Sequence, residues 1–492
     1  MIRRLTTASV VALATTLSVA AQQQAPQNPS SAPGTVLKNR APVSNEVLKV
    51  HLPKPQEADL PNGLHLMVLE DHRAPLITMQ LIVEGAGGYY DPSGSPGLAG
   101  FTAALMREGT ATKTSEEISE QLDRLAASLN VSAGTSSPFA TVGASCLNDQ
   151  VDMLLGMMSD VLQHPSFAEA EVGRYKNRQR ALLANQRTQP GFLAQERFQA
   201  AAYGDHPASR VSASPAALDA VTHEQLVAFH HDHYAPDHAV LAIAGDITMA
   251  AAKQKVESAL GNWARSSSQL AQVTEPPDVQ HATVSLVARP NSVQTNLIVG
   301  TQSVDRTSPD YDALTVANRI LGGGPSGRLF EHLREQKGYT YGAYSNFTAG
   351  RYRGPWSAST EVRTEVTDPA LHDLLDEIRQ MRDVPVSAKE LADSKRAIVA
   401  GFARSLESPT AVLANYIDLY LYKLPADYWD TYPDRIDAIS AAEVQKVAQK
   451  YWTSDRLQVV AVGDAQKIEP ALAKIGDVRK FDVEGKEIGG GK

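Results

Sequence analysis

Histidines are the residues of this chain whose types and spacing first suggest chemistry, because imidazole nitrogens are common metal ligands. Four of them stand close together: His230, His231, His233 and His238. His223 is followed by Glu224, which begins the zinc-binding pattern H-E-x-x-H. The second histidine of that pattern would be residue 227, which is Val227 here. The His223 pattern is therefore incomplete, and a cation held by His230 with His233, or by His231 with Asp232, is the alternative.

A glycine-rich stretch is the second candidate, since Gly322–Gly327 matches G-x-G-x-x-G. A nucleotide site of this kind needs a strand before the glycines and a helix opening after them. The preceding residues 311–321 instead carry apolar side chains at helical spacing, and no Lys-Ser or Lys-Thr follows. The sequence therefore predicts a helix over 311–321 and argues against phosphate binding.

The only cysteine, Cys146, excludes an internal disulfide framework. Its apolar, alternating surroundings predict a buried thiol rather than a nucleophile. The formal net charge of -9 is spread without any lysine-arginine tract, so the footprint of a nucleic-acid-binding protein is missing. A length of 492 residues predicts two or more domains.

The N-terminus has the layout of a secretory signal peptide over residues 1–21, with two arginines, an apolar run and small residues before Gln22. Residues 22–49 are rich in Gln, Pro, Ser and Ala, which predicts a flexible leader. No later segment is apolar enough for a membrane span. We therefore expect an exported protein, periplasmic or secreted.

The elements that must position any site are mixed helices and strands. Residues 60–69 indicate a turn followed by a strand, and residues 77–83 indicate a second strand. Residues 115–129 carry apolar side chains on one helical face. Because strands and helices do not alternate strictly, an α+β fold is favoured over a doubly wound sheet.

An internal repeat organises the chain. The segment from Thr222 to Gly245 is matched by the segment from Ser440 to Gly463, and the offset between the two copies is the same at both ends. The constant offset spans a helix and a strand, which indicates duplication. The predicted halves are residues 50–262 and 283–478, joined by a polar linker over 263–282 and followed by a flexible tail over 479–492.

The stretch Gly97–Thr110 resembles the signature helix of the insulinase/pitrilysin and mitochondrial processing peptidase family, which reads roughly G-L-A-H-F-L-E-H-M-x-F-K-G-T. That family's inverted motif H-x-x-E-H supplies two zinc ligands and the base that activates water. Here Gly100 and Ala104 stand in place of the histidines, and Ala103 in place of the glutamate. Neither glycine nor alanine coordinates a cation or transfers a proton, so we expect no metal in this chain.

The resemblance also implies the position of the third zinc ligand, which is a glutamate in a later helix of the same half. Asn185, or else Ala184, stands in that place. An asparagine amide is a poor zinc ligand. The resemblance implies two homologous α/β sandwich domains that face each other across a chamber. It places the histidine run at a polar helix end, so that a solvated histidine face is predicted there.

The segment Arg328–Tyr341 resembles the family's second-domain motif, in which an arginine and a tyrosine that follows it point into the chamber. Here these are Arg334 and Tyr341, and Gly338 is suited to end the helix between them. A guanidinium and a phenol both donate hydrogen bonds to a substrate carbonyl or to a developing oxyanion.

A degenerate zinc motif with an intact arginine and tyrosine resembles the non-zinc subunit of heterodimeric family members. The leading hypothesis is therefore an exported subunit that lacks its own zinc site. It would bind extended peptides and pair with a zinc-bearing homologue. The first alternative is a scaffold protein on the same fold, as the core subunits of respiratory complexes are. The second is an active metallopeptidase that uses a displaced metal.

Overall fold

The computed structural model describes residues 49–267 and 269–489. The predicted signal peptide, 1–21, and all but the last residue of the predicted leader, 22–49, lie outside the described residues. None of the helices within the two described ranges is long and apolar enough to cross a membrane.

The first sheet has the strand order β1-β2-β6-β3-β5-β4. Its strands are β1 (Gln56–Asp59), β2 (His65–Glu70), β3 (Leu76–Glu84), β4 (Ser128–Ala133), β5 (Phe139–Leu147) and β6 (Ala239–Gly245). β2 and β6 are parallel, whereas β6, β3, β5 and β4 are successively antiparallel. Both faces of β6 are buried, which explains its unbroken apolar sequence.

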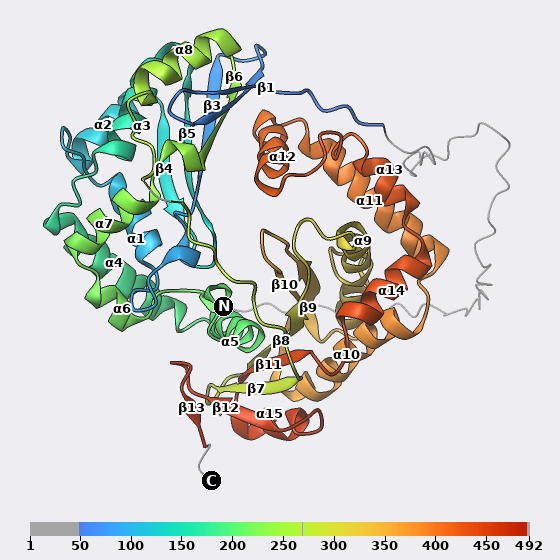
Figure 1. Ribbon diagram of the computed structural model, residues 1–492. Coiled ribbons are helices and arrows are strands. Elements are labelled where there is room, and N and C mark those ends of the chain that lie inside the picture. Colours follow the sequence, from blue (N-terminus) through green and yellow to red (C-terminus); the bar gives the residue numbers. More distant parts are fainter. Residues whose placement is uncertain (1–48, 268, 490–492) are drawn as a thin grey trace, which may run out of the picture. The chain divides into compact units, whose positions relative to one another are not determined.

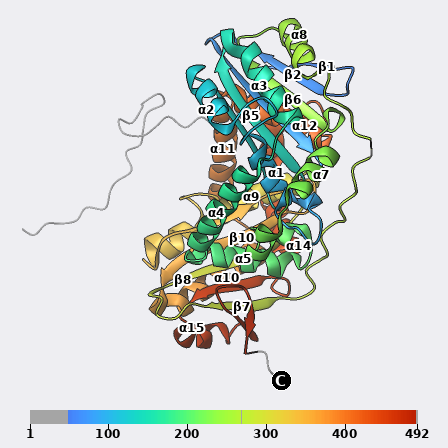
Figure 2. The same ribbon diagram turned by 90° about the vertical axis from the view of Figure 1, so that its left-hand side faces the viewer.

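Helices cover one face of this sheet (Figures 1 and 2). They are α1 (Leu98–Met106), α2 (Ser115–Arg124), α3 (Val151–Gln163), α4 (Glu169–Gln186), α6 (Pro215–Ala220), α7 (His223–His233) and α8 (Met249–Leu260). Short 3-10 turns are η1 (Gly88–Tyr90), η2 (Asn148–Gln150), η3 (Pro207–Ser209) and η4 (Pro236–His238). Thr114 and Thr222 begin α2 and α7 with complete capping boxes.

The second sheet has the order β13-β12-β7-β11-β8-β10-β9. Its strands are β7 (Thr283–Ala288), β8 (Gln294–Gln302), β9 (Thr340–Phe347), β10 (Pro355–Arg363), β11 (Gln458–Gly463), β12 (Val478–Phe481) and β13 (Glu487–Ile488). The helical elements of this half are α9 (Tyr311–Leu321), α10 (Thr367–Asp383), α11 (Ala388–Ser405), α13 (Tyr432–Ala438), α14 (Ala441–Tyr451) and α15 (Ala465–Leu472), with the π-helix η5 (Phe330–Gln336) and the turn η6 (Thr364–Val366).

Five strands of each sheet repeat the same order, β2-β6-β3-β5-β4 in the first and β7-β11-β8-β10-β9 in the second, which confirms the duplicated α+β fold. β2 and β7 begin at His65 and Thr283, whereas β3 and β8 begin at Leu76 and Gln294. Both pairs of strands are therefore separated by the same length of chain, which is also the offset of the sequence repeat. β6 takes the same place between β2 and β3 as β11 takes between β7 and β8. The predicted helix over 311–321 is also confirmed as α9.

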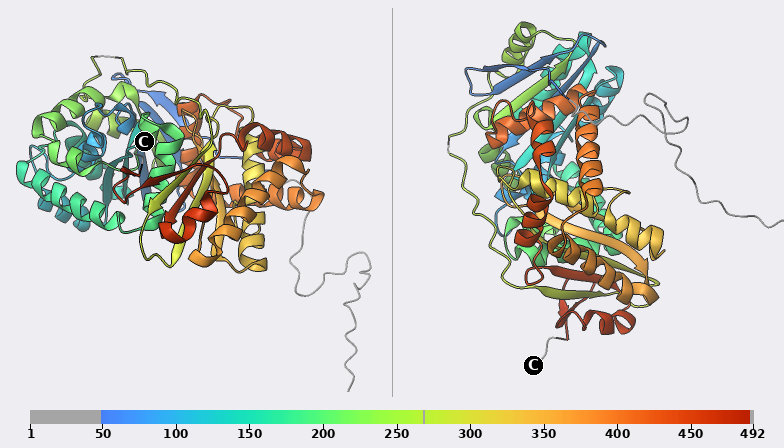
Figure 3. Two further views of the ribbon diagram at one scale, coloured as in Figure 1. Left: turned by 90° about the horizontal axis from the view of Figure 1, so that it is seen from below. Right: turned by 90° about the vertical axis from the view of Figure 1, so that its right-hand side faces the viewer.

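Two helices are exchanged between the halves. α5 (Pro190–Tyr203) belongs to the first half in sequence but packs on β8 and β11 of the second sheet, with Phe198 against Ile298 and Val460 in one buried cluster. α12 (Pro409–Tyr422) packs in return on β6 of the first sheet. Figure 3 shows this orange-red helix against the blue and green strands. Each sheet is therefore completed by a helix from the other half.

The C-terminal residues correct one prediction, because most of the expected flexible tail over 479–492 forms structure. β12 pairs in parallel with β7, and β13 turns back antiparallel to β12. Phe481 is buried beneath the guanidinium of Arg197, which lies 4.2 Å from the ring centroid. Arg479 pairs with Glu487 across the hairpin at 2.7 Å. Burial of an aromatic ring and strand pairing offset the entropy of ordering this segment.

Candidate functional site

The degenerate motif lies on α1, whose start is fixed by a buried carboxylate. Asp91 accepts hydrogen bonds from the backbone N–H of Gly97 at 2.6 Å and of Ala99 at 2.7 Å. Gly97 has a φ of 95°, which favours glycine. Burial raises the pKa of Asp91 to about 6, against the opposing effect of these two hydrogen bonds and of Arg210. The helix is therefore held at its first turn independently of any metal.

The three motif positions share one side of α1, as their spacing predicts. Gly100 is half-buried and faces β4, Ala103 has no exposed surface, and Ala104 packs against the core of the first half. None of the three side chains carries an atom that can coordinate zinc.

The helix that would supply the third ligand, α4, packs beside α1. The Phe101 and Tyr175 rings meet edge to face at 4.7 Å, and Arg178 pairs with Glu108 at 3.2 Å. Asn185 lies further along α4 and is exposed, and Ala184 beside it is exposed as well. Within the described chain the Asn185 side chain makes no hydrogen bond. Its equivalence to the family's glutamate therefore stays a prediction.

These residues do not fit a zinc ion. The donor set would consist of one asparagine amide, because Gly100, Ala103 and Ala104 contribute no ligand atom. Across residues 49–267 and 269–489, no group of three or more His, Cys, Asp or Glu side chains is arranged to hold a metal. We therefore derive no chemical step through a metal in this chain.

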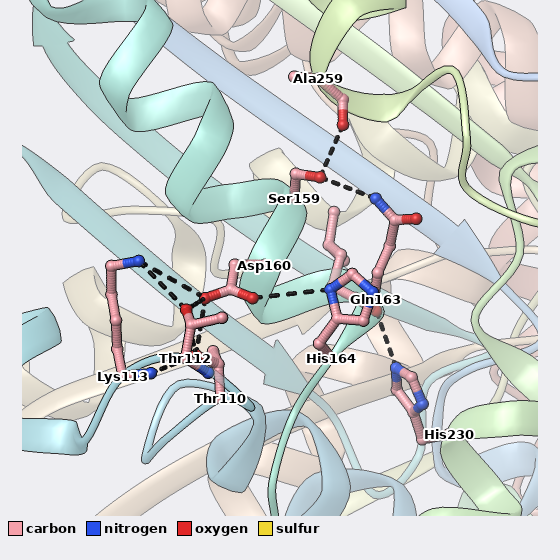
Figure 4. A network of polar contacts seen from close by, with 10 residues as sticks. Thr110, Thr112, Lys113, Ser159, Asp160, Gln163, His164, His230 and Ala259 are labelled. Atoms are coloured by element: carbon pink, nitrogen blue, oxygen red, sulfur yellow. Dashed lines mark hydrogen bonds and ion pairs between the residues drawn. The ribbon is translucent and has the colours of Figure 1, made fainter.

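The histidine cluster is not the solvated face that was predicted. His230 donates from Nε2 to the carbonyl oxygen of Leu162 at 2.8 Å (Figure 4). Its ring also stacks on Tyr234. His233 stacks on Phe229 with the ring centroids 4.2 Å apart. Burial lowers the pKa of both imidazoles. His230 and His233 are therefore partly buried and engaged with neighbouring side chains, whereas His231 beside them is exposed.

The residues that follow α1 are anchored by a second carboxylate, Asp160 on α3 (Figure 4). Its Oδ2 atom accepts hydrogen bonds from the hydroxyls of Thr110 at 2.7 Å and Thr112 at 2.6 Å. Lys113 and His164 lie 3.7 and 3.6 Å from this carboxylate. Thr110, at the end of the motif, therefore has a structural role that does not depend on a metal. This role explains why the residues around the motif are kept although the zinc ligands are absent.

The glycine-rich turn after α9 is packed against its own surroundings. A Cβ atom at Gly322 would lie 2.5 Å from the backbone nitrogen of Ser345, which donates to the Gly322 carbonyl. The N–H groups of Gly322 and Gly323 both donate to Asn318, and that of Gly327 donates to Gly324. Three N–H groups of this turn are therefore engaged within the fold.

Arg334 lies on η5, which ends at Gln336, and the predicted stop residue Gly338 follows two residues later. Gly338 has a φ of 62°, and its N–H donates to the Arg334 carbonyl at 3.0 Å. The Arg334 guanidinium lies 4.7 Å from the ring centroid of Phe330 and 3.4 Å from Glu335. Tyr341, on β9, is 92% exposed. Both groups are accessible, and no contact between them is recorded in the described chain.

Two family models match this chain. Residues 66–216 match the insulinase family, peptidase family M16, and residues 220–398 match the peptidase M16 inactive domain. The chain belongs to peptidase family M16. The first match contains Gly100, Ala103, Ala104 and Asn185, whereas the second contains Arg334 and Tyr341.

Relatives and solved structures agree with this membership. An uncharacterized zinc protease of Bacillus subtilis (strain 168) is 24% identical over 75% of this chain and 89% of its own length. The peptidase M16 inactive domain from Pseudomonas fluorescens is 28% identical, with a TM-score of 0.76 over 83% of this chain and 98% of that one. A protease from Helicobacter pylori shares the fold at 17% identity, with a TM-score of 0.77 over 84% of this chain and 100% of that one.

Sequence reasoning missed three residues that shape this M16 chain. Asp91 and Asp160 hold the two ends of the α1 region, and His332 fixes η5 by a 2.8 Å contact with Glu377 on α10. Asp91 stands six residues before Gly97, so the pattern of a helix start, which concerns the residue directly before the helix, did not indicate it. The partners of Asp160 and His332 come from distant elements, so no local pattern indicates them.

Proposed function

We propose that this M16 chain is a catalytically incomplete peptidase homologue that binds extended peptides together with a zinc-bearing homologue. The observation that carries the proposal is the packed, donor-free face of Gly100, Ala103 and Ala104 inside an otherwise complete peptidase fold. A chain that retains both halves without ligands or base is suited to binding rather than to hydrolysis. Zinc and the water-activating base would come from the partner.

Peptide capture would use the outer edge of the first sheet. β4 pairs with β5 along one side, and it pairs with no strand of the described chain on the other. An exposed edge offers backbone N–H and C=O groups to an extended peptide without demanding one sequence. The carbonyl oxygen of Ala133, near Gly100, belongs to this edge.

Arg334 and Tyr341 would act on the partner's substrate. Their exposed donors are free to meet a carbonyl oxygen or the negative charge that develops on it during hydrolysis. In this proposal the arginine supplies charge and the phenol supplies a directed hydrogen bond. The proposal includes export by a signal peptide over residues 1–21, on the sequence layout alone.

The test is reconstitution with the zinc-bearing homologue that co-purifies from the native host. The mixture should cleave an unstructured peptide faster than the homologue alone. Arg334→Ala and Tyr341→Phe should each reduce this gain, on the order of a hundredfold for one lost donor, without preventing assembly. Arg73→Ala and Tyr420→Phe are matched controls, since both side chains are exposed and lie outside β9 and η5.

Two results would contradict the proposal. Chelator-sensitive cleavage by this chain alone, after removal of homologues, would make it a peptidase in its own right. Full activity of both substituted mixtures would leave Arg334 and Tyr341 as structural residues and favour the scaffold alternative.

A further inference from the structure

The linker between the two halves is docked against both of them. The carbonyl oxygen of Thr274 lies 2.9 Å from Nε2 of His206, in the first half. Pro277 accepts a 2.8 Å hydrogen bond from the Gln302 side chain of the second half. Arg353, also of the second half, contacts the Pro276 carbonyl and the Asp278 carboxylate. Residues 274–278 therefore form a strap across the junction.

Both ring nitrogens of His206 are engaged, and only one protonation state satisfies them. Nδ1 accepts a hydrogen bond from the backbone N–H of Ala208 at 3.1 Å, so it carries no proton. Nε2 therefore carries the proton and donates it to the Thr274 carbonyl. The ring is 7% exposed and meets Tyr89 of the first half and Tyr352 of the second half edge to face.

Adding a proton to this ring is unfavourable while the strap is docked. An imidazolium has no acceptor nitrogen, so its Nδ1 proton would point at the Ala208 N–H. A ring that turns away from this contact also loses the hydrogen bond from Nε2 to the Thr274 carbonyl, which is the contact with the strap. Burial lowers the pKa of His206, the Thr274 carbonyl and Glu275 oppose that effect, and the guanidiniums of Arg210 and Arg353 add to it. Tyr89 and Tyr352 are neutral, because burial raises the pKa of both phenols.

From this geometry we infer that His206 is a proton-sensitive clamp, which holds the strap of residues 274–278 against both halves when neutral and releases it when protonated. A released His206 has the ordinary histidine pKa, which is higher than that of the docked ring. The clamp is therefore complete above the ordinary pKa and weakens as the pH falls through it. Release would free the only covalent connection between the halves to move. The inference does not depend on the proposed function.

Limited proteolysis of the full chain tests the clamp directly. We expect cleavage within residues 273–279 to be several-fold faster at about pH 5.5 than at about pH 7.5, on either side of the ordinary histidine pKa, with a protease that is active at both. The cleavage rate of an unstructured peptide, measured at both pH values, corrects for the pH dependence of the protease itself.

Three variants separate titration of His206 from general loosening. His206→Gln keeps an acceptor and a donor but cannot titrate, so the strap should stay protected at both pH values. His206→Ala loses both bonds and should expose the strap at both. His231→Gln removes an exposed histidine that contacts Asp232 and should behave like the wild type. Equal wild-type protection at the two pH values, or an unchanged pH response in His206→Gln, would overturn the inference.

Discussion

Gly100 faces the carbonyl oxygen of Ala133, so that a Cβ atom at residue 100 would lie 3.3 Å from that oxygen. This is closer than ordinary van der Waals contact, so a larger side chain requires the edge strand β4 to shift. Ala103, one turn further along α1, has no exposed surface. The motif face is therefore closed by packing at Ala103, whereas Gly100 and Ala104 stay partly exposed.

Restoring the family's residues should therefore cost stability. Ala103→Glu places a carboxylate into a fully buried, apolar position, and we expect the free energy of unfolding to fall by at least about 3 kcal/mol. Ala184→Glu, on the exposed side of α4, should change it by less than about 0.5 kcal/mol. Denaturant unfolding of both variants measures the difference. An Ala103→Glu variant as stable as the wild type would show that this face opens readily.

The purified chain should bind no stoichiometric zinc, because Gly100, Ala103 and Ala104 supply no ligand atom. Elemental analysis after dialysis against trace zinc is the measurement. About one tightly held zinc per chain would contradict this expectation. Its loss on substitution of His230 and His233 would then identify the histidine cluster as a displaced site.

Asp91 should make stability depend on pH in the direction opposite to an ordinary paired carboxylate. Its pKa is about 6 in the folded protein against 3.8 for the free group. The folded state therefore favours the neutral acid, and stability relative to Asp91→Asn should fall as the pH rises from about 4 to about 6. The change should be on the order of 3 kcal/mol.

Asp160 provides the contrasting variant for this experiment. Burial raises its pKa, but the hydrogen bonds from Thr112 and Thr110 and the charge of Lys113 outweigh burial and lower it overall. Its contribution should be present above the ordinary carboxyl pKa and lost as the pH falls. Unfolding of Asp91→Asn between about pH 4 and pH 6, and of Asp160→Asn below about pH 4, should therefore show slopes of opposite sign relative to the wild type. Slopes of the same sign would contradict the assignment.

The halves should not fold when they are expressed separately. A fragment of residues 49–262 would leave Phe198 of α5 without the second sheet, and Met67 and Val240 without α12. Loss of such buried contacts costs about 3–5 kcal/mol for a single large side chain. We expect insoluble or unfolded fragments by circular dichroism, and soluble protein when both are co-expressed. Cooperative unfolding of either fragment alone would contradict this.

Local signals in the sequence predicted those structural features that depend only on residues close together along the chain. Periodicity predicted the helix over 311–321, which is present. The backbone freedom of glycine predicted the end of that helix at Gly322 and the positive φ of Gly338 just after η5, and both are present. The constant offset of the internal repeat indicated the duplicated fold. The loss of zinc ligands is also a local fact, since Gly100 and Ala104 lack donor atoms in any fold.

Contacts between distant elements could not be predicted in this way. An amphipathic pattern shows that a helix has a buried face but not which sheet covers it, so the exchange of α5 and α12 was missed. His230 is a polar residue in the sequence, yet the Leu162 carbonyl accepts a hydrogen bond from its ring, which makes partial burial of the ring possible. Phe481 gives no signal in a short tail, because its partner Arg197 lies on a distant helix.

The exchange of α5 and α12 also sets an order of events during synthesis on the ribosome. The first sheet is complete in sequence once β6 has emerged, but α12 begins only at Pro409. At about 5–20 residues per second, the face that carries Met67 and Val240 stays bare for roughly 8–30 s. We therefore expect a nascent chain of this protein to bind holding chaperones until α12 has been made.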